Sequence, residues 1–134
     1  MTIDVFIPCF VDQLYPETGM NMLKILRKAG IDYRYNPKQT CCGQPSFNSG
    51  YWDETLPVAK KFLRDFDTGR HIVCPSASCA AFVKEDFPKL SDEPSFLALH
   101  KKIADNLFEL TDFLVNVAEK TQFDAEFHKK VTYH

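Results

Sequence analysis

The sequence has no long apolar run and no segment in which charge of one sign accumulates. None of its apolar stretches approaches the roughly 18 residues of a membrane-spanning helix. Its start does not resemble a signal peptide, because Asp4 interrupts the first apolar run and no basic residue precedes it. Lys and Arg number 16 and Asp and Glu 18, which gives a net charge of -2. We therefore expect neither a nucleic-acid-binding face nor a polybasic membrane-binding segment.

Motifs that would assign a function directly are also missing. There is no glycine-rich loop for a phosphate or a dinucleotide. There is no Cys-x2-Cys pair of the thioredoxin type, and the four histidines offer no obvious partner for a nucleophilic cysteine. Five cysteines, an odd number without an export signal, argue against a disulfide framework. Reduced thiols in a cytoplasmic protein are the better interpretation, and they indicate metal binding, catalysis or buried packing.

The pattern that is present indicates one globular domain. The chain has 134 residues, of which 45% are hydrophobic and 25% charged, so it can bury a core. Because apolar strand-like runs alternate with segments of helical periodicity, we predict an α/β fold with a small parallel sheet flanked by helices. The predicted strands are 3–7, 31–35 and 71–73; the predicted helices are 17–29, 53–66, 76–87 and one or two within 96–117; a loop is predicted at 39–45.

A cysteine follows each predicted strand. Cys9 comes after the first, Cys41 and Cys42 come after the second, and Cys74 and Cys79 come at and beyond the end of the third. The carboxyl ends of parallel strands meet at one edge of a sheet, so these connections should bring their thiols to a common rim. Adjacent thiolates can ligate neighbouring metal atoms. The pattern therefore favours a site for a soft metal or an iron–sulfur cluster.

The residue after the adjacent pair, Gly43, supports a cluster, because glycine lets backbone N–H groups approach inorganic sulfur closely. A structural zinc site is an alternative that would use Cys74 and Cys79 as one short pair. Cys41 and Cys42 make a poor second pair, because adjacent side chains in an extended loop point apart. In the third interpretation the cysteines are buried packing residues. Cys74, at the end of an apolar Ile-Val-Cys run, fits that interpretation best.

The cysteine pattern resembles a known family. The order Cys9, then Cys41-Cys42-Gly43, then Cys79 is similar to the cysteine-rich CCG domain found in heterodisulfide reductase and in the iron–sulfur subunit of glycolate oxidase. Heterodisulfide reductase members bind an unusual, non-cubane [4Fe–4S] assembly through such cysteines. The resemblance therefore implies a [4Fe–4S] cluster whose ligands are Cys9, Cys41, Cys42 and Cys79.

One position departs from the family pattern. The last family cysteine falls at Phe82, which cannot ligate iron. Three alternatives follow: Cys74 substitutes for the missing ligand, four protein ligands suffice, or this domain holds no cluster. In the last case the domain would be empty of cofactor.

Two longer strings are similar to the lactate-utilisation protein A branch of the family. They are Cys-Cys-Gly-Gln-Pro-x-x-Asn-Ser-Gly at 41–50 and Glu-Leu-Thr-Asp-Phe-Leu-Val-Asn-Val at 109–117. Members of that branch are longer and hold two such domains in tandem. We therefore expect residues 1–130 to form one CCG domain and residues 131–134 to begin a second domain of a longer protein.

The resemblance also implies a function. The chain would be an iron–sulfur, electron-transfer component of an oxidoreductase complex for L-lactate, or for glycolate, in the cytoplasm. Its partners would be other iron–sulfur subunits of that complex and the second CCG domain of its own protein. The alternatives are a non-redox scaffold with free or disulfide-paired thiols, and a structural zinc domain.

Overall fold

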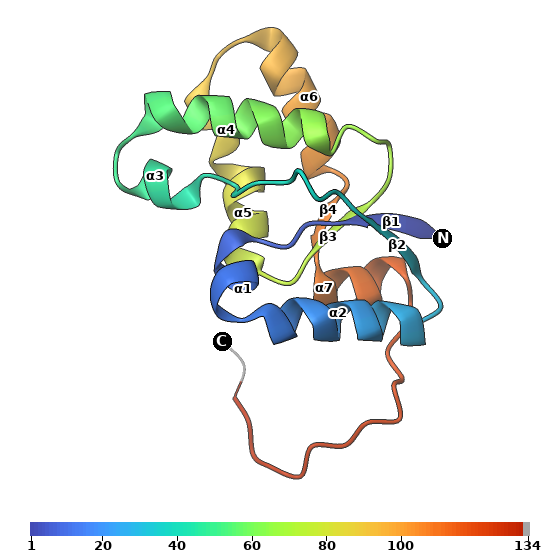
Figure 1. Cartoon of the computed structure of the whole chain (residues 1–134). Coiled ribbons are helices and arrows are strands. Elements are labelled where there is room, and N and C mark those ends of the chain that lie inside the picture. The colour runs from blue at the N-terminus through green and yellow to red at the C-terminus, as the bar shows by residue number, and fades with distance from the viewer. Residues whose placement is uncertain (133–134) are drawn as a thin grey trace.

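A four-stranded parallel sheet organises the chain (Figure 1). The structure, a computed structural model, describes residues 1–132. The strands lie in the order β2-β1-β3-β4, and every neighbouring pair is parallel. The predicted α/β class with a small parallel sheet flanked by helices is thus confirmed. The strands are β1 (Thr2–Val5), β2 (Asp32–Tyr35), β3 (Ile72–Cys74) and β4 (Leu107–Glu109).

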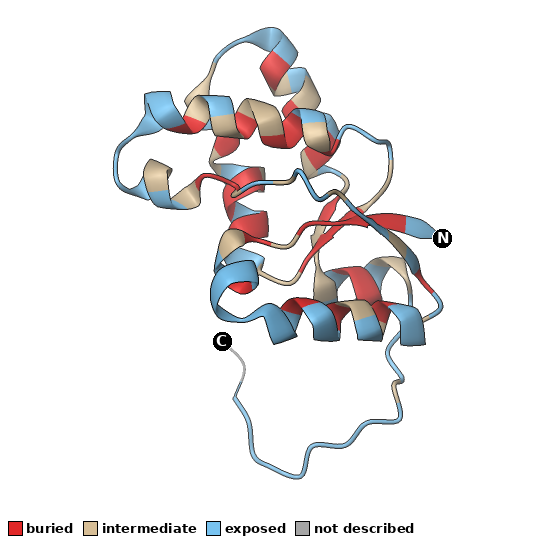
Figure 2. Ribbon diagram, in the orientation of Figure 1, coloured by how far each residue is buried: buried red, intermediate tan, exposed pale blue. Residues whose placement is uncertain are grey.

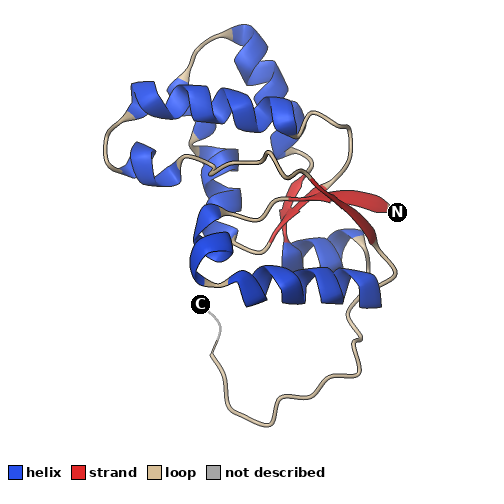
Figure 3. Cartoon of the chain, viewed as in Figure 1, coloured by secondary structure: helices blue, strands red, loops and turns tan. Residues whose placement is uncertain are grey.

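Helices cover both faces of the sheet (Figure 3). Pro16 begins α2 at a first helical position, where its missing N–H leaves no bond unmade. The helical segments are α1 (Cys9–Leu14), α2 (Pro16–Lys28), α3 (Gln44–Asn48), α4 (Trp52–Asp65), α5 (Ala77–Glu85), the 3₁₀ turn η1 (Phe87–Leu90), α6 (Pro94–Ala104), α7 (Leu110–Asp112) and the π turn η2 (Phe113–Val117). Within residues 1–132, none of these helices has the length and apolarity needed to cross a bilayer.

The core consists of two clusters of buried residues, because successive side chains of a strand point to opposite faces of the sheet. Figure 2 shows buried residues along the strands and in the helices that flank them. On one face Ile72 and Leu107 pack with the buried sides of α4, α5 and α6. On the other face Ile3, Val5 and Val73 pack with α2 and η2. The central strand β3 is a fully buried apolar run, as expected where both faces of a parallel sheet are covered, whereas the edge strand β2 is largely exposed.

Some predicted elements are wrong. The predicted helical stretch 96–117 is interrupted, because α6 ends at Ala104 and residues 107–109 form β4 beside β3. Two short helices, α1 and α3, occupy stretches that were not predicted to be helical. A helix of one or two turns carries too little periodic pattern to be recognised before the fold is known. The strand expected to begin at 131–134 is not seen at 131 and 132, and residues 133–134 lie outside the described residues.

Candidate metal centre

The fold brings cysteines from three strand–helix connections to one edge of the sheet. Cys9 is the first residue of α1, shortly after β1. Cys41 and Cys42 lie in the loop between β2 and α3. Cys74 is the last residue of β3, and Cys79 lies in the first turn of α5. All five therefore lie at or beyond the carboxyl ends of strands, where parallel sheets build their sites.

Four of these thiols form a continuous row of contacts. The Sγ atoms of Cys9 and Cys41 are 3.2 Å apart. The Cys42 thiol lies near enough to the thiols of Cys41 and Cys79 for both to raise its pKa. Cys9 and Cys41 are partly exposed, whereas Cys42 and Cys79 are buried. The row thus runs from the surface into the core in the order Cys9, Cys41, Cys42, Cys79.

Cys74 lies outside this row. Its side chain is fully buried among the residues that pack under α4 and α5. Its Sγ is 3.4 Å from both the backbone N and the backbone O of Ser76. These contacts satisfy the thiol locally, as in a cysteine that packs like a small hydrophobe. Cys74 is therefore the candidate that the geometry separates from the other four.

The contacts within the row give its thiols different pKa values. The hydrogen bond from Cys42, assisted by the Gly43 N–H, lowers the pKa of Cys41 to about 5. The same Cys42 thiol, together with the Ser76 and Ser78 hydroxyls, lowers the pKa of Cys79 to about 6. Cys42 has one S–H hydrogen, so it serves one of these neighbours at a time. Thiolates are the form that ligates metals, so Cys41 and Cys79 are prepared for that role.

The other two thiols of the row are donors. Burial, together with the hydrogen bond to Cys41, raises the pKa of Cys9 to about 11. Hydrogen bonds to Cys41 and Cys79, with burial, raise the pKa of Cys42. A metal bound by all four would have to displace these two protons.

Gly43 gives the cysteine loop its shape. Its φ of 95° is a left-handed backbone conformation that residues with a side chain rarely adopt. This turn directs the Gly43 N–H at the Cys41 Sγ, 3.3 Å away. Ser46 Oγ donates to the Gly43 carbonyl at 2.9 Å, and it lies 2.6 Å from the hydroxyl of Thr55, a residue with no exposed surface. The loop is thereby held against α4.

We expect Gly43→Ala to destabilise the chain by about 2 kcal/mol, because strain and a close contact add at this position. A Cβ there would lie 3.0 Å from Thr55 Cγ2, in addition to the left-handed φ. Gly50→Ala is the matched control: its φ is also positive, at 86°, but a Cβ would meet nothing within 4 Å. Urea unfolding should give a loss of about 1 kcal/mol for the control. Equal losses at the two positions would contradict the role of the Thr55 contact.

Aromatic rings flank the cysteine loop. The rings of Phe47 and Trp52 are stacked with centroids 4.7 Å apart, and Trp52 Nε1 donates to the Phe47 carbonyl at 3.1 Å. Phe47 also contacts Phe82, where the resemblance would place a cysteine, at 5.2 Å between centroids. The stacked pair thus joins the start of α4 to α3, the helix that follows the cysteine loop.

The donor atoms of the row suit an iron–sulfur cluster, but the present distances between its sulfurs are too short for one. Within residues 1–132, no three His, Cys, Asp or Glu side chains are arranged to hold one metal ion. Two thiolates on one tetrahedral zinc lie about 3.8 Å apart, farther than the 3.2 Å between the Cys9 and Cys41 sulfurs. The donors are all thiols, with a backbone N–H beside one sulfur, and this set is typical of iron–sulfur ligation. The sulfurs would have to separate to surround a cluster.

Comparison with known proteins matches this site to a family. A family model described as CCG, cysteine-rich domain, matches residues 3–84, which include all five cysteines. Proteins named Lactate utilization protein A are similar along the whole chain: 37% identity in Halalkalibacterium halodurans, 37% in Shouchella clausii and 34% in Bacillus pumilus. Each alignment covers 100% of this chain but 55%, 56% and 56% of the relative, so the chain spans about half their length. No solved structure matches the chain.

Proposed function

The chain belongs to the cysteine-rich CCG domain family, and on that premise we propose that it is an iron–sulfur component of a lactate-utilisation system. Its cofactor would be a [4Fe–4S] cluster held by the four thiols of the row. The observation that carries this proposal is the contact of four thiols from three strand–helix connections at one sheet edge. The ligands are Cys9, Cys41, Cys42 and Cys79.

The cluster would supply one-electron transfer, and the protein residues would hold and tune it. Cys41 and Cys79 have the lowest thiol pKa values and would ligate as thiolates without further activation. The Gly43 N–H, already 3.3 Å from the Cys41 sulfur, would stabilise negative charge there. The stacked Phe47 and Trp52 rings, beside the cysteine loop, would limit the access of water to the cluster.

The names of the relatives guide the wider role. Since proteins named Lactate utilization protein A are similar over the full chain, we place this domain in the oxidation of L-lactate as an electron-transfer subunit. It would act in the cytoplasm with other iron–sulfur subunits and with a second CCG domain in a longer protein. The thiol row supports the electron-transfer part of this proposal, and we do not assign lactate binding to this domain.

The test is metal analysis after anaerobic reconstitution. We expect about four irons with matching acid-labile sulfide per chain. Cys41→Ser combined with Cys42→Ser should remove nearly all of both, because it replaces two of the four thiolate ligands. Cys74→Ala is the matched control and should keep the full iron content, because its thiol is engaged with Ser76 rather than with the row.

Other metal contents would point to other functions. Stoichiometric zinc without sulfide would make the site a structural zinc domain, despite the short Cys9–Cys41 spacing. A folded chain that binds no metal would favour a scaffold whose partly exposed Cys9 and Cys41 thiols, 3.2 Å apart, can pair. Loss of iron in Cys74→Ala would instead make Cys74 a ligand.

A further inference from the structure

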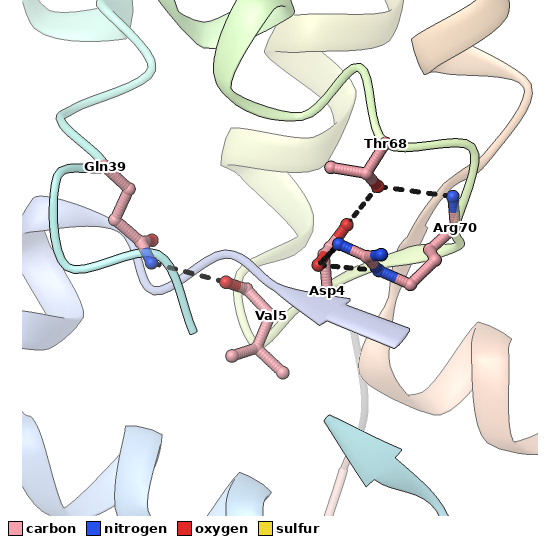
Figure 4. A network of polar contacts seen from close by, with 5 residues as sticks. All are labelled: Asp4, Val5, Gln39, Thr68 and Arg70. Carbon is pink, nitrogen blue, oxygen red and sulfur yellow. Dashed lines mark hydrogen bonds and ion pairs between the residues drawn. The ribbon is translucent and has the colours of Figure 1, made fainter. Parts of the chain in front are cut away.

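The side chain of Gln39 joins two of the cysteine-bearing connections. Its Oε1 accepts from the Ile7 backbone N–H at 2.8 Å. Its Nε2 donates to the Val5 carbonyl at 3.3 Å, as Figure 4 shows, and to the Asn36 carbonyl at 3.1 Å. The loop after β2 is thus bonded to the segment after β1 by one partly buried carboxamide.

The two bonds to β1 have the pattern of a parallel sheet. In a parallel pair, the N–H of one residue donates to the residue before its opposite neighbour, and the C=O of the same residue accepts from the residue after that neighbour. Gln39 does this around Phe6, since it donates to Val5 and accepts from Ile7. On the other side of the strand the Phe6 N–H donates to the Val73 carbonyl at 2.9 Å.

Backbone pairing between β1 and β2 ends at Val5 and Tyr35. The chain then turns at 36–38, so no further β2 peptide lies beside Phe6. A carboxamide offers the same donor and acceptor as a peptide group. The Gln39 side chain therefore extends the ladder beyond the point where the β2 backbone leaves it.

We propose that Gln39 is the positioning residue of the thiol row. Cys41 lies two residues after Gln39, and Cys9 lies two residues after Ile7, so the clamp sets the distance between their thiols. That this positioning serves cluster binding rests on the proposed function. The placement itself is a property of the metal-free chain.

A second polar contact on the same loop provides a control. Lys61 Nζ donates to the Lys38 carbonyl at 2.7 Å, which attaches the loop to α4 and not to the β1 segment. Removing it with Lys61→Met should leave the separation of Cys9 and Cys41 unchanged. Gln39→Glu keeps the shape of the side chain but replaces the amide donor with an acceptor that faces the Val5 carbonyl.

The experiment measures disulfide closure in the metal-free, reduced chain. The Cys9 and Cys41 sulfurs join in a disulfide, and their two electrons and two protons pass to oxidised glutathione, whose S–S bond breaks to give two glutathione thiols. Peptide mapping by mass spectrometry identifies the pair and its rate of formation. We expect the Cys9–Cys41 disulfide to dominate in the parent chain and in Lys61→Met, and to form about tenfold more slowly in Gln39→Glu.

Wild-type closure rates in Gln39→Glu would overturn the proposal, and so would a different dominant disulfide in the parent chain. Hydrogen exchange at the Ile7 amide gives a second, local readout, and its protection should fall in the variant. If Gln39→Glu does not fold, Gln39→Asn retains the amide but is one methylene too short, and the same slow closure is expected. Because the assay uses no iron, its result is independent of whether the chain binds a cluster.

Discussion

Replacing Phe82 with cysteine is expected to destabilise the chain by about 3 kcal/mol, because it empties a filled core position. The Phe82 ring is 1% exposed. It meets the Phe87 ring edge-on at 5.4 Å and the Phe47 ring at 5.2 Å. A thiol would restore the family's last cysteine but would fill only part of the space that these rings enclose.

Chemical denaturation measures this loss directly. Phe82→Leu is the control, since it keeps most of the apolar volume, and about 1 kcal/mol should be lost there. A loss below about 1 kcal/mol in Phe82→Cys would show that the surrounding rings close over the space. Position 82 lies one helical turn after Cys79, so iron counted in the same sample reports whether a thiol there adds to the row.

A comparable loss, about 3 kcal/mol, is expected for Arg70→Met, because it leaves a buried carboxylate without its cation. The Asp4 side chain lies inside β1 and the residue is only 6% exposed. Its Oδ1 accepts from Arg70 Nε at 3.0 Å and from Nη2 at 2.9 Å, while the Thr68 hydroxyl donates to Oδ2 (Figure 4). One hydroxyl cannot replace a bidentate guanidinium.

Two further variants test whether the loss in Arg70→Met comes from the burial of the unpaired Asp4 charge. Lys101→Met breaks an ion pair with Asp105 whose side chains are 77% and 62% exposed, so we expect no loss of stability that urea unfolding resolves. Adding Asp4→Asn to Arg70→Met removes the orphaned charge and should restore part of the lost stability. If urea unfolding gave equal losses for Arg70→Met and Lys101→Met, the Asp4 pair would be an ordinary surface contact.

The parallel sheet could be predicted because the two connections between its first three strands have clear helical signals. The 17–29 and 53–66 segments carry apolar residues at helical spacing, and both helices form close to those limits. β4 could not be found in the same way. Its three residues lie between helical segments, and only their pairing with Ile72–Cys74 of β3 makes them a strand. A short strand is defined by its neighbour rather than by its own sequence.

The candidate site, too, could be predicted only in part from the sequence. The order of strands and cysteines predicts the edge where the thiols gather, because parallel topology fixes that edge. That order alone does not separate Cys74 from the others. The apolar Ile72-Val73-Cys74 run favours it as a packing cysteine, but its contacts with the Ser76 backbone depend on a turn that the sequence does not reveal. Gln39 and Thr55 were also missed. A glutamine in a loop and a threonine in a helix carry no pattern in the sequence, and their roles arise from partners far along the chain or across a loop.

The position of β1 in the sheet has a consequence for biosynthesis. The ribosome makes this strand before the other three, yet it lies between β2 and β3. Its second edge stays open until residues 72–74 emerge, and non-local parallel pairing of this kind forms slowly. Cys79 is translated later still, so a nascent chain offers an incomplete set of thiols to any metal donor. For the proposed cluster, we therefore expect delivery after translation of this domain rather than during it.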